Sequence, residues 1–299
     1  MKVFVTGATG WVGSAVVQEL IKAGHQVLAL ARSDASAKLL TAVGAHVHRG
    51  DVEDLDSLRS GAAMSDGVIH TAFNHDFSKW AAHCEADRRA IEAFGSALAG
   101  SDRALVVSSG TLLVSPGRLA TEEDAGVTSK EIPRAASEEA ARTLVERGVR
   151  VSVVRLSPSV HGDGDHGFVP TLINIAREKG ESAYVGEGNN RWTGVHRLDA
   201  ARLYRLAVEK GAAGARYHGA DEEAIPFRDI AEVIGRRLHI PIASKSPEEA
   251  ADHFGWIAHF TQFDGPASSK LTRQRLGWQP QQPGLIPDLE HSTRYFERS

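Results

Sequence analysis

Short runs of apolar, β-branched residues alternate with amphipathic segments through the first half of the chain. The runs predict strands, and the segments with an apolar residue every three or four positions predict helices. The expected strands are Lys2–Thr6, Gln26–Ala31, Ala45–His48, Gly67–His70, Ala104–Ser108 and Val151–Leu156. The expected helices are Val12–Ala23, Ser36–Val43, Leu55–Ala62, Ala81–Leu98 and Ser137–Arg147. Such strict alternation requires crossover connections between parallel strands, so the pattern predicts an α/β fold with a doubly wound parallel sheet.

The alternation ends after Leu156. Two glycine-rich stretches, SPSVHGDGDHGF from Ser157 and YVGEGNNRWTGVH from Tyr184, are expected to form loops. A helix, a strand and a second helix are expected to follow, at Leu198–Glu209, Ala215–Gly219 and Phe227–Leu238, ahead of a proline-rich tail after Leu276.

The second half is therefore predicted to be interleaved with the first rather than strung after it. Residues 1–156 are expected to form one domain, to which residues 195–220 return. Residues 157–194 and 221–299 are expected to form a smaller C-terminal lobe.

A glycine-rich turn joins the first predicted strand to the first predicted helix. In VFVTGATGWVG, the three glycines are spaced three residues apart. Glycine permits a tight turn, brings backbone N–H groups close to a pyrophosphate and lets the helix pack closely, while the helix N-terminus favours negative charge. The turn predicts a dinucleotide site in a Rossmann-type domain. The residues expected to contact the dinucleotide here are Gly7, Thr9, Gly10, Trp11, Val12 and Gly13.

The end of the second strand indicates which dinucleotide binds. QVLALARS ends in Arg32 and Ser33, where an Asp or Glu would select NAD; an arginine suits the 2′-phosphate of NADP. We expect NADP(H), and NAD is the alternative in which Arg32 is a solvated residue and Asp34 contacts the ribose. Asp51 and Val52 follow the third strand and are placed to meet the adenine. Asp51 could also be the N-cap of the next helix.

Composition excludes several classes of partner. The chain carries 34 Lys and Arg residues scattered among 38 Asp and Glu residues, with a formal charge of −4, and has no basic stripe for nucleic acid. Its single cysteine, Cys84, allows neither an intramolecular disulfide nor a paired-cysteine zinc site. The segment HGDGDHG from His161 is expected to be a flexible lid rather than a metal site. No stretch approaches the roughly 20 apolar residues of a spanning helix, and the N-terminus is unlike a signal peptide. We expect a protein of the reducing cytosol that binds a small molecule and neither nucleic acid, membrane nor metal.

Five motifs occur in a familiar order: TGATGWVG from Thr6, Asp51 with Val52, IHTA from Ile69, VVSS from Val106 and RLSPSVHG from Arg155. The chain resembles the extended and atypical short-chain dehydrogenase/reductases, which include the NAD-dependent epimerases and dehydratases. The resemblance implies that GVHRLDAARLYRLAVE is the returning strand and helix. It also implies that Asn74 and His75 face the cofactor cleft. The further cofactor contacts that it implies are Thr71, Ala72, Phe73, Ser108, Arg134, Pro158 and Val160.

The chain departs from the family at its usual active-site pair. Most members have a tyrosine, with a lysine four residues later and often a glutamate four after that. In SKEIPRAASEEA, Glu138 matches the glutamate, which puts Arg134 at the lysine position and Lys130 at the tyrosine position. No tyrosine lies between Gly7 and Leu156. The sequence resembles an atypical subgroup in which a basic pair replaces the tyrosine and the lysine.

The chemistry of the pair limits what each member can do. Arg134 stays protonated, so it could hold the ribose or stabilise an alkoxide but not readily donate a proton. Lys130 could be a general acid only if burial beside Arg134 lowered its pKa; the alternative is an exposed loop residue. Ser109 and Thr111, after the fifth strand, match the family's substrate-binding hydroxyl, or else serve in a turn. His161 is a further acid candidate, unless it is structural.

Three functions remain open. The first is an NADP-dependent oxidoreductase, of the carbonyl reductase or alcohol dehydrogenase type, acting on a small to medium organic substrate in the cleft. The second is an epimerase or dehydratase acting on a sugar nucleotide. The third is a non-catalytic NADP-binding sensor. An enzyme should have Lys130, His161 or Ser109 within reach of the substrate oxygen, whereas a sensor would tolerate an exposed Lys130.

Relatives often form homodimers through two helices that correspond to Ala81–Leu98 and Ser137–Arg147. The apolar stripe Ala90, Ile91, Phe94 and Leu98 would serve such an interface, or could equally be an ordinary core face.

Overall fold

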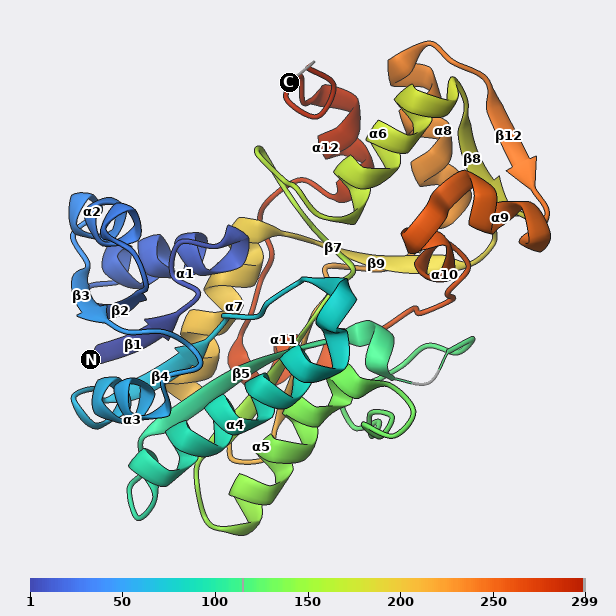
Figure 1. The fold of residues 1–299 in the computed structure, drawn as a ribbon. Coiled ribbons are helices and arrows are strands. Elements are labelled where there is room, and N and C mark those ends of the chain that lie inside the picture. Colours follow the sequence, from blue (N-terminus) through green and yellow to red (C-terminus); the bar gives the residue numbers. More distant parts are fainter. Residues whose placement is uncertain (115, 298–299) are drawn as a thin grey trace.

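The computed structural model describes residues 1–114 and 116–297 and consists of a large parallel sheet covered by helices, with a smaller lobe beside it (Figure 1). The sheet has seven strands in the order β10-β6-β5-β4-β1-β2-β3, and every neighbouring pair is parallel. The strands are β1 Lys2–Thr6, β2 Gln26–Ala31, β3 His46–Arg49, β4 Gly67–His70, β5 Ala104–Gly110, β6 Val151–Leu156 and β10 Arg216–Gly219. The doubly wound α/β fold expected from the sequence is confirmed.

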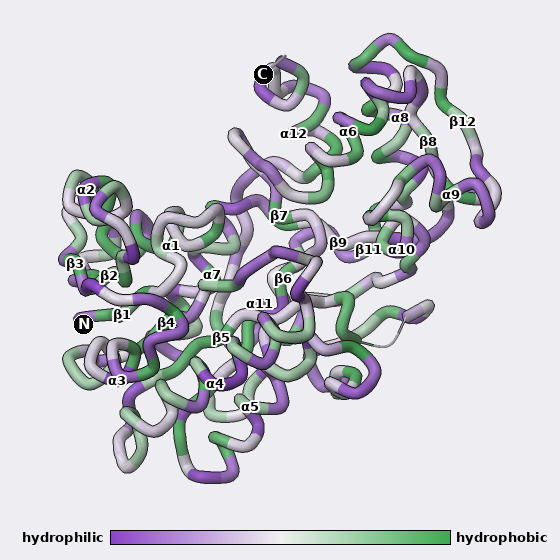
Figure 2. Tube along the Cα trace, in the orientation of Figure 1, coloured by the Kyte–Doolittle hydropathy of each residue, from purple (hydrophilic) through white to green (hydrophobic). Residues whose placement is uncertain are grey.

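Helices cover both faces of the sheet because its strands bury side chains on both. In β1, Val3 and Val5 join one hydrophobic core and Phe4 joins the other, as the alternation of a strand requires. Figure 2 shows hydrophobic positions gathered along β4 and β5 inside the sheet. The covering helices are α1 Trp11–Lys22, α2 Asp34–Ala42, α3 Leu55–Ala63, α4 Trp80–Leu98, α5 Ala136–Glu146 and α7 Arg197–Lys210.

The strand order reverses at β1, which pairs with β2 on one side and β4 on the other. In open α/β sheets, ligands bind beyond the carboxyl ends of the strands at such a switch point. The chain leaves β1 at Thr6 and β4 at His70, so the segments that follow these two residues form the floor of the expected site.

The lobe contains two small sheets, β11-β9-β7 and β12-β8. Their strands are β7 Ser159–His161, β8 Ser182–Val185, β9 Arg191–His196, β11 Glu222–Pro226 and β12 Ile242–Lys245. The helices of the second half, besides α7, are α6 Phe168–Lys179, α8 Phe227–Leu238, α9 Pro247–Phe254, α10 Ala258–Thr261, α11 Lys270–Leu276 and α12 Leu285–His291. Short 3₁₀ segments are η1 Phe77–Lys79, η2 Thr111–Leu113, η3 Pro133–Ala135 and η4 Gly255–Ile257.

The expectation that both glycine-rich stretches form loops was wrong in part. The first contains β7, and the second contains β9 and the end of β8. Strand β9 is central in its small sheet, pairing with β7 and β11, and its Trp192 and Val195 are fully buried. The glycines suggested turns, but partners distant in sequence and burial of the apolar side chains favour the extended backbone.

Two segments of the second half pack with the large sheet. Strand β10 extends its edge beside β6, as part of residues 195–220. Leu276 and Trp278 belong to the same hydrophobic core as Val3, although they lie within residues 221–299. The division between domain and lobe therefore stays a proposal, with residues 270–278 placed beside the large sheet.

The apolar stripe considered for a dimer interface lies inside a single chain. Ala90, Ile91, Phe94 and Leu98 are fully buried in the core under α3, α4 and α5. They cannot also form an exposed contact surface, so a homodimer would need another face. Among the described residues, no helix combines the length and apolarity needed to cross a membrane.

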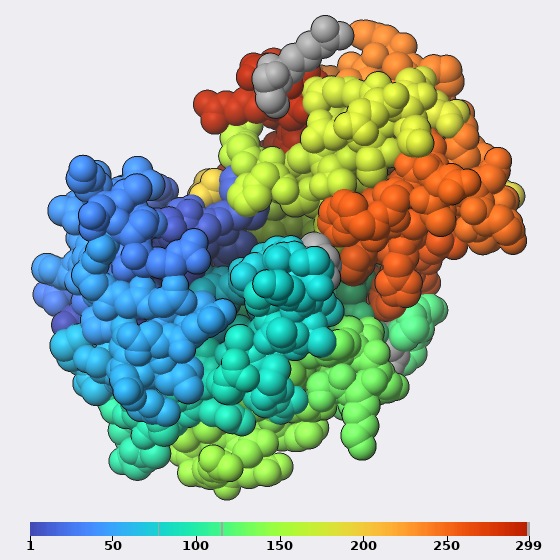
Figure 3. Space-filling model, viewed as in Figure 1, coloured from blue at the N-terminus to red at the C-terminus, as the bar shows by residue number. Residues whose placement is uncertain are grey.

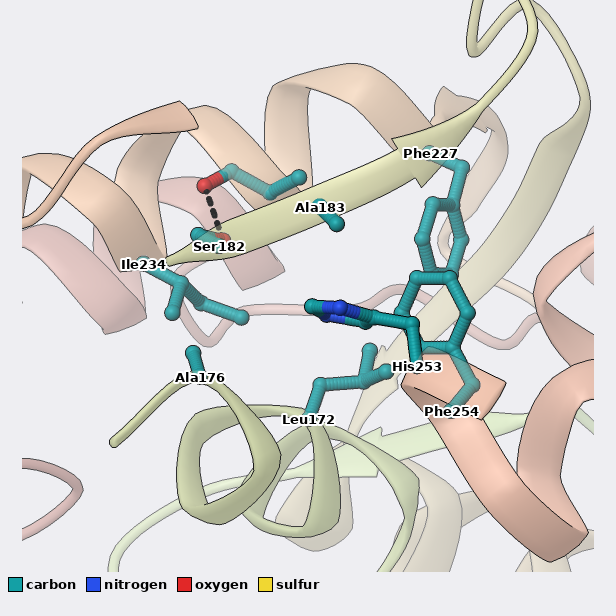
Figure 4. A pocket seen from close by; sticks show the side chains of 9 residues that line it. Leu172, Ala176, Ser182, Ala183, Phe227, Ile234, His253 and Phe254 are labelled. Atoms are coloured by element: carbon teal, nitrogen blue, oxygen red, sulfur yellow. Dashed lines mark hydrogen bonds between the residues drawn. The ribbon is translucent and has the colours of Figure 1, made fainter. Parts of the chain in front are cut away.

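A small cavity of about 10 Å³ lies within the lobe, lined mainly by apolar side chains of α6, α8 and α9 (Figure 4). His253 and Phe254 reach into it from α9, and Ser182 at its edge donates a hydrogen bond to the Ala231 carbonyl. Its volume is about that of one water molecule, far below the few hundred cubic ångströms of a substrate pocket. The cavity is a packing defect of the lobe rather than a binding site.

Candidate functional site

The glycine turn is built by backbone packing. Gly7 has a φ of +67°, and a Cβ on it would lie 2.6 Å from the Ala72 nitrogen. A Cβ on Gly13 would lie 2.0 Å from the Gly7 carbonyl oxygen. These contacts exclude larger residues and bring the turn against the segment that follows β4. Gly10 is the N-cap of α1, and it has no side chain to cap the first-turn N–H groups.

The open amides at the start of α1 fit the pyrophosphate of a dinucleotide. No acidic residue lies in the first turn of the helix, so nothing opposes an anion there. Thr9 and Gly10 are exposed, and Trp11 and Val12 are half-buried, around the same helix end. The hollow between the large sheet and the lobe is visible on the surface, where blue and cyan segments face yellow-green ones (Figure 3).

Trp11 connects the glycine turn to the lobe. Its indole Nε1 donates a hydrogen bond of 2.7 Å to the Val160 carbonyl of β7, and the Arg197 guanidinium lies 4.0 Å from the ring centre. Arg197 also donates to Ser14 of α1. Val160 and Pro158 are half-buried at this junction. The expected nicotinamide-side residue Val160 is thus fixed relative to α1.

At the same edge of the sheet as the start of α1, the carboxyl ends of β2 and β3 present two arginines. The Arg32 side chain is 84% exposed, and its Nε lies 3.9 Å from the Asp51 carboxylate. Arg49 of β3 pairs with Asp34 at 2.6 Å. The alternative role of Asp51 as a helix cap was wrong: Asp54 caps α3 by accepting from the Ser57 N–H.

Ser33 and Val52 complete the surroundings of Arg32. Ser33 caps α2, its Oγ accepting from the Ser36 N–H, and is exposed beside Arg32. Val52 packs against the core on the α3 side of the sheet. Asp51 keeps a local role, since its Oδ1 accepts from the Glu53 N–H.

A chain of buried polar groups runs beneath the switch point. The Thr6 Oγ1 lies 2.6 Å from Nδ1 of His70, and His70 Nε2 lies 2.9 Å from Asp87 Oδ1. Asp87 on α4 is buried and also accepts hydrogen bonds from Ser137 and Arg134. Burial alone would raise the pKa of the Asp87 carboxyl, but the positive charge of Arg134 and the contacts with His70 and Ser137 hold that pKa below its usual value.

Arg134 ends this polar chain at the edge of the cleft. Its Nη2 donates a 3.0 Å hydrogen bond to the Ser108 carbonyl at the end of β5, and its Nη1 lies 3.3 Å from Asp87. The guanidinium also lies 4.2 Å from the centre of the Phe73 ring. Its side chain is 15% exposed, so part of it stays accessible although several partners hold it. Thr71, whose Oγ1 donates to the Thr6 carbonyl, lies in the same floor.

The two hydroxyls considered as catalytic are engaged elsewhere. Ser109 Oγ donates a 2.6 Å hydrogen bond to Glu138, which is paired with the fully buried Arg155. Thr111 is buried, with its Oγ1 3.1 Å from that of Thr193. Both hydroxyls therefore lie within hydrogen-bonding distance of other groups of the protein.

Lys130 and Arg134 do not belong to one helix. Lys130 is exposed in a turn, and the helical structure begins only at Pro133. The four-residue spacing therefore does not place the two side chains on one helical face. His161 is fully buried, its Nδ1 lying 2.8 Å from Asp288 of α12. The role of each as proton donor stays a prediction from sequence.

Sequence reasoning missed the polar chain and gave His75 no role in catalysis. Thr6 and His70 are the last residues of two predicted strands, which is a signal that could have been used; nothing in the sequence around Asp87 marks its partners. The His75 ring packs on Phe73, with ring centres 5.1 Å apart. Its side chain is exposed, but protein surrounds it closely enough that burial lowers its pKa, and the charge of Arg134 lowers it further.

Comparisons with known proteins agree with this geometry. The model of the NAD dependent epimerase/dehydratase family matches residues 3–219. An uncharacterized protein of Schizosaccharomyces pombe is 50% identical over 297 residues, covering 99% of this chain and 100% of that protein. The 2-alkyl-3-oxoalkanoate reductase of Stenotrophomonas maltophilia is 27% identical over 269 residues, 82% of this chain and 78% of the reductase.

A solved structure shares the fold. A double mutant of the dTDP-glucose 4,6-dehydratase of Streptomyces venezuelae, with NAD bound, has a TM-score of 0.77 at 19% identity, covering 99% of this chain and 97% of that one. The family match spans β1 to β10, and so includes the glycine turn, Arg134 and the whole large sheet. The chain therefore belongs to the NAD-dependent epimerase/dehydratase family.

Proposed function

We propose that this protein is an NADP-dependent oxidoreductase that reduces a carbonyl, or oxidises the corresponding alcohol, on a small to medium organic molecule. The observation that carries the proposal is the position of Arg134. Its guanidinium is fixed near the carboxyl end of β5 by Asp87 and the Ser108 carbonyl, packs on the Phe73 ring at the switch point, and belongs to a side chain that is 15% exposed. A fixed cation there stabilises negative charge that develops on a substrate oxygen.

The residues around the switch point divide the remaining tasks. The amides at the start of α1 bind the pyrophosphate, and Arg32, with little to hold it but a long contact to Asp51, binds the 2′-phosphate that distinguishes NADP from NAD. Bound NADPH supplies the hydride. Trp11 and Val160, joined by a hydrogen bond, form a wall between cofactor and lobe. The reductase among the relatives is consistent with this chemistry.

Binding of the dinucleotide is the first test. Fluorescence titration should give a lower Kd for NADPH than for NADH. Arg32→Ala should raise the Kd for NADPH about tenfold or more, the effect of losing one charge-assisted hydrogen bond, and leave that for NADH unchanged. Arg59→Ala, at an exposed arginine of α3, is the matched control and should change neither value. Equal affinity for the two cofactors, unaffected by Arg32→Ala, would contradict the NADP assignment.

Turnover is the second test. The NADPH complex is mixed with a panel of ketones and aldehydes, and loss of absorbance by NADPH is followed. Turnover on a member of the panel supports an oxidoreductase. Tight NADPH binding without consumption on any carbonyl would contradict it and favour an epimerase, which returns its hydride, or a sensor.

A specific observation keeps the sensor as the second candidate. Lys130 is exposed, Ser109 is bound to Glu138, and His161 is buried against Asp288. None of the three groups named from sequence as proton donors therefore has an open position beside Arg134. A sensor would bind NADPH with the same affinity and show no turnover with any substrate.

A further inference from the structure

The proposed reduction needs a group that exchanges a proton with the substrate oxygen. Arg134 cannot do so, because a guanidinium does not lose its proton in a protein. The family's tyrosine is absent, and the hydroxyls of Ser109 and Thr111 are used in hydrogen bonds to Glu138 and Thr193. The chain must supply the proton from another titratable side chain on the open face of the cleft.

His75 lies on that face. It follows β4 on the segment that passes directly over the glycine turn, where the Ala72 nitrogen would be 2.6 Å from a Cβ on Gly7. The His75 ring packs edge-on against Phe73 at 5.1 Å, with an angle of 71° between the rings. Phe73 is the same ring that Arg134 contacts at 4.2 Å. One aromatic side chain thus positions both the fixed cation and the imidazole.

Accessibility separates His75 from the other histidines near the switch point. His70 is buried and engaged by Thr6 and Asp87 on its two ring nitrogens, and His161 is buried against Asp288. The side chain of His75 is exposed, so a ligand and solvent protons can reach it. His166 is also exposed, but its ring packs against Trp11, at 5.7 Å, on the lobe side.

We propose that His75 exchanges the proton with the substrate oxygen while Arg134 stabilises the charge on that oxygen; the inference rests on the proposed oxidoreductase function. In reduction, the hydride adds to the carbonyl carbon, and the π electron pair moves to the oxygen. The oxygen takes a proton from the His75 imidazolium, and the neutral ring regains a proton from solvent. In oxidation, the neutral ring accepts the hydroxyl proton and the carbon gives up the hydride. Charge and protons balance in both directions.

The groups around His75 set the sign of its pH dependence. Burial and then Arg134, which faces it from η3, lower the pKa of His75, and His166, from the loop before α6, lowers it as well. The Phe73 backbone and Asp87, from α4, act in the opposite direction without reversing the shift. The ring is therefore mostly neutral above its ordinary value of about 6.5. Reduction, which needs the charged ring, should slow as pH rises through the lowered pKa, whereas oxidation should speed up and level off.

Two independent measurements test the role of His75. The first is an NMR titration of the His75 ring, assigned with His75→Gln, without nucleotide and with NADP⁺. We expect a pKa below 6.5 that rises in Arg134→Gln, and a change of the resonance when NADP⁺ binds. The second is the pH profile of kcat/KM for the carbonyl found by the panel. His75→Gln should lose on the order of 10²-fold or more in reduction and lose the pH dependence, with the Kd for NADPH unchanged.

His46→Gln, at an exposed histidine of the edge strand β3, is the matched control and should behave as the wild type. A His75→Gln enzyme with the wild-type rate and pH profile would overturn the role of His75 and leave the oxidoreductase function standing. A His75 ring that titrates at 6.5 and ignores NADP⁺ would likewise overturn it. A wild-type protein that binds NADPH but reduces no carbonyl would overturn the oxidoreductase function, and the proton transfer with it.

Discussion

Two arginine–carboxylate pairs lie near the carboxyl ends of β5 and β6, and they differ in what surrounds the arginine. Arg155 is 0% exposed; its Nε and Nη2 donate to Glu138, and its Nη1 donates to the Asp124 carbonyl. Arg134 is paired with Asp87 but keeps 15% of its side chain exposed. The first pair has no capacity left for a ligand, whereas the second holds a cation in place and leaves one side of it open.

A neutral histidine, His218, lies beside the Arg155–Glu138 pair and adds to its burial. Burial and then the charge of Arg155 lower the pKa of His218 to about 4, so this ring is neutral. Its Nδ1 donates to the Ser268 carbonyl at 2.9 Å, which leaves Nε2, 3.4 Å from Arg155 Nη1, as an acceptor. The comparison teaches that residue type alone does not separate a structural arginine from a functional one. The exposed fraction of the side chain separates them, at 0% for Arg155 and 15% for Arg134.

Breaking the Arg155–Glu138 pair should have the largest effect, and the effect should be on stability. Arg155→Leu leaves the Glu138 carboxylate buried without its partner, and the free energy of unfolding should fall by about 3–5 kcal/mol. Urea unfolding followed by far-UV circular dichroism measures the change. Arg147→Leu, at an exposed arginine just after α5, is the control and should stay within about 0.5 kcal/mol of the wild type. A small loss in Arg155→Leu would mean that the Arg155–Glu138 pair contributes little.

Removing the open cation should act on turnover more than on stability. Arg134→Gln should lower kcat for the carbonyl substrate on the order of 10²–10³-fold, the usual effect of losing one group that stabilises an oxyanion. Asp87 keeps its contacts with His70 and Ser137, so the folded state should survive. Arg134→Lys should restore only part of the rate, because lysine keeps the charge but not the planar fork. A rate unchanged by Arg134→Gln would remove the distinction between the two pairs.

The Arg155–Glu138 pair should make the stability of the protein fall at acid pH. Burial alone would raise the pKa of the Glu138 carboxyl, but the hydrogen bonds and charge of Arg155 hold it below its usual value. Such a group stabilises the fold fully above its unfolded pKa of about 4.3, and the stabilisation disappears as pH falls through the lowered folded value. The wild type should therefore lose stability more steeply below about pH 4 than Glu138→Gln does. Equal slopes for the two proteins in urea unfolding between pH 5 and pH 3 would contradict the expectation.

The smallest effect is expected at the ring shared by Arg134 and His75. Phe73→Leu removes a cation–π contact worth about 0.5–1 kcal/mol, so kcat/KM should fall roughly two- to fivefold. The Kd for NADPH should change by no more than the same factor. A loss as large as that of Arg134→Gln would mean that Phe73 contacts the substrate itself.

Local signals sufficed for the large sheet. The β-branched runs, their spacing and the glycines at 7, 10 and 13 predicted six of its seven parallel strands before any contact was known, and β10 followed from the run at Ala215–Gly219. These features depend on residues near each other in sequence. In the lobe, by contrast, β7 depends on β9, about 30 residues later, and the glycines around both concealed the strands.

The candidate site was predictable only in part for the same reason. Arg134 was found from its spacing to Glu138, but its anchor Asp87 lies 47 residues away on another helix. Lys130 was placed at the tyrosine position by counting back from Glu138 along the family's spacing, and spacing alone did not reveal that Lys130 lies in an exposed turn ahead of the helical structure that begins at Pro133. Ser109 was identified from its place after the predicted fifth strand, but it lies within β5 and its hydroxyl is bound to Glu138, 29 residues away.

The way Trp278 fills the core bears on how the protein is made. Its indole donates to the Asp199 carbonyl of α7, and its ring shares a core with Val3 and Leu20. A ribosome adding about 5–20 residues per second needs several seconds to travel from the end of α7 at Lys210 to this residue. During that time the apolar face of α7 is exposed in the nascent chain, because Trp278 has not yet been added. We expect early translation products to be the most dependent on chaperones, and stop codons placed before Trp278 to yield protein that is degraded rather than a smaller functional domain.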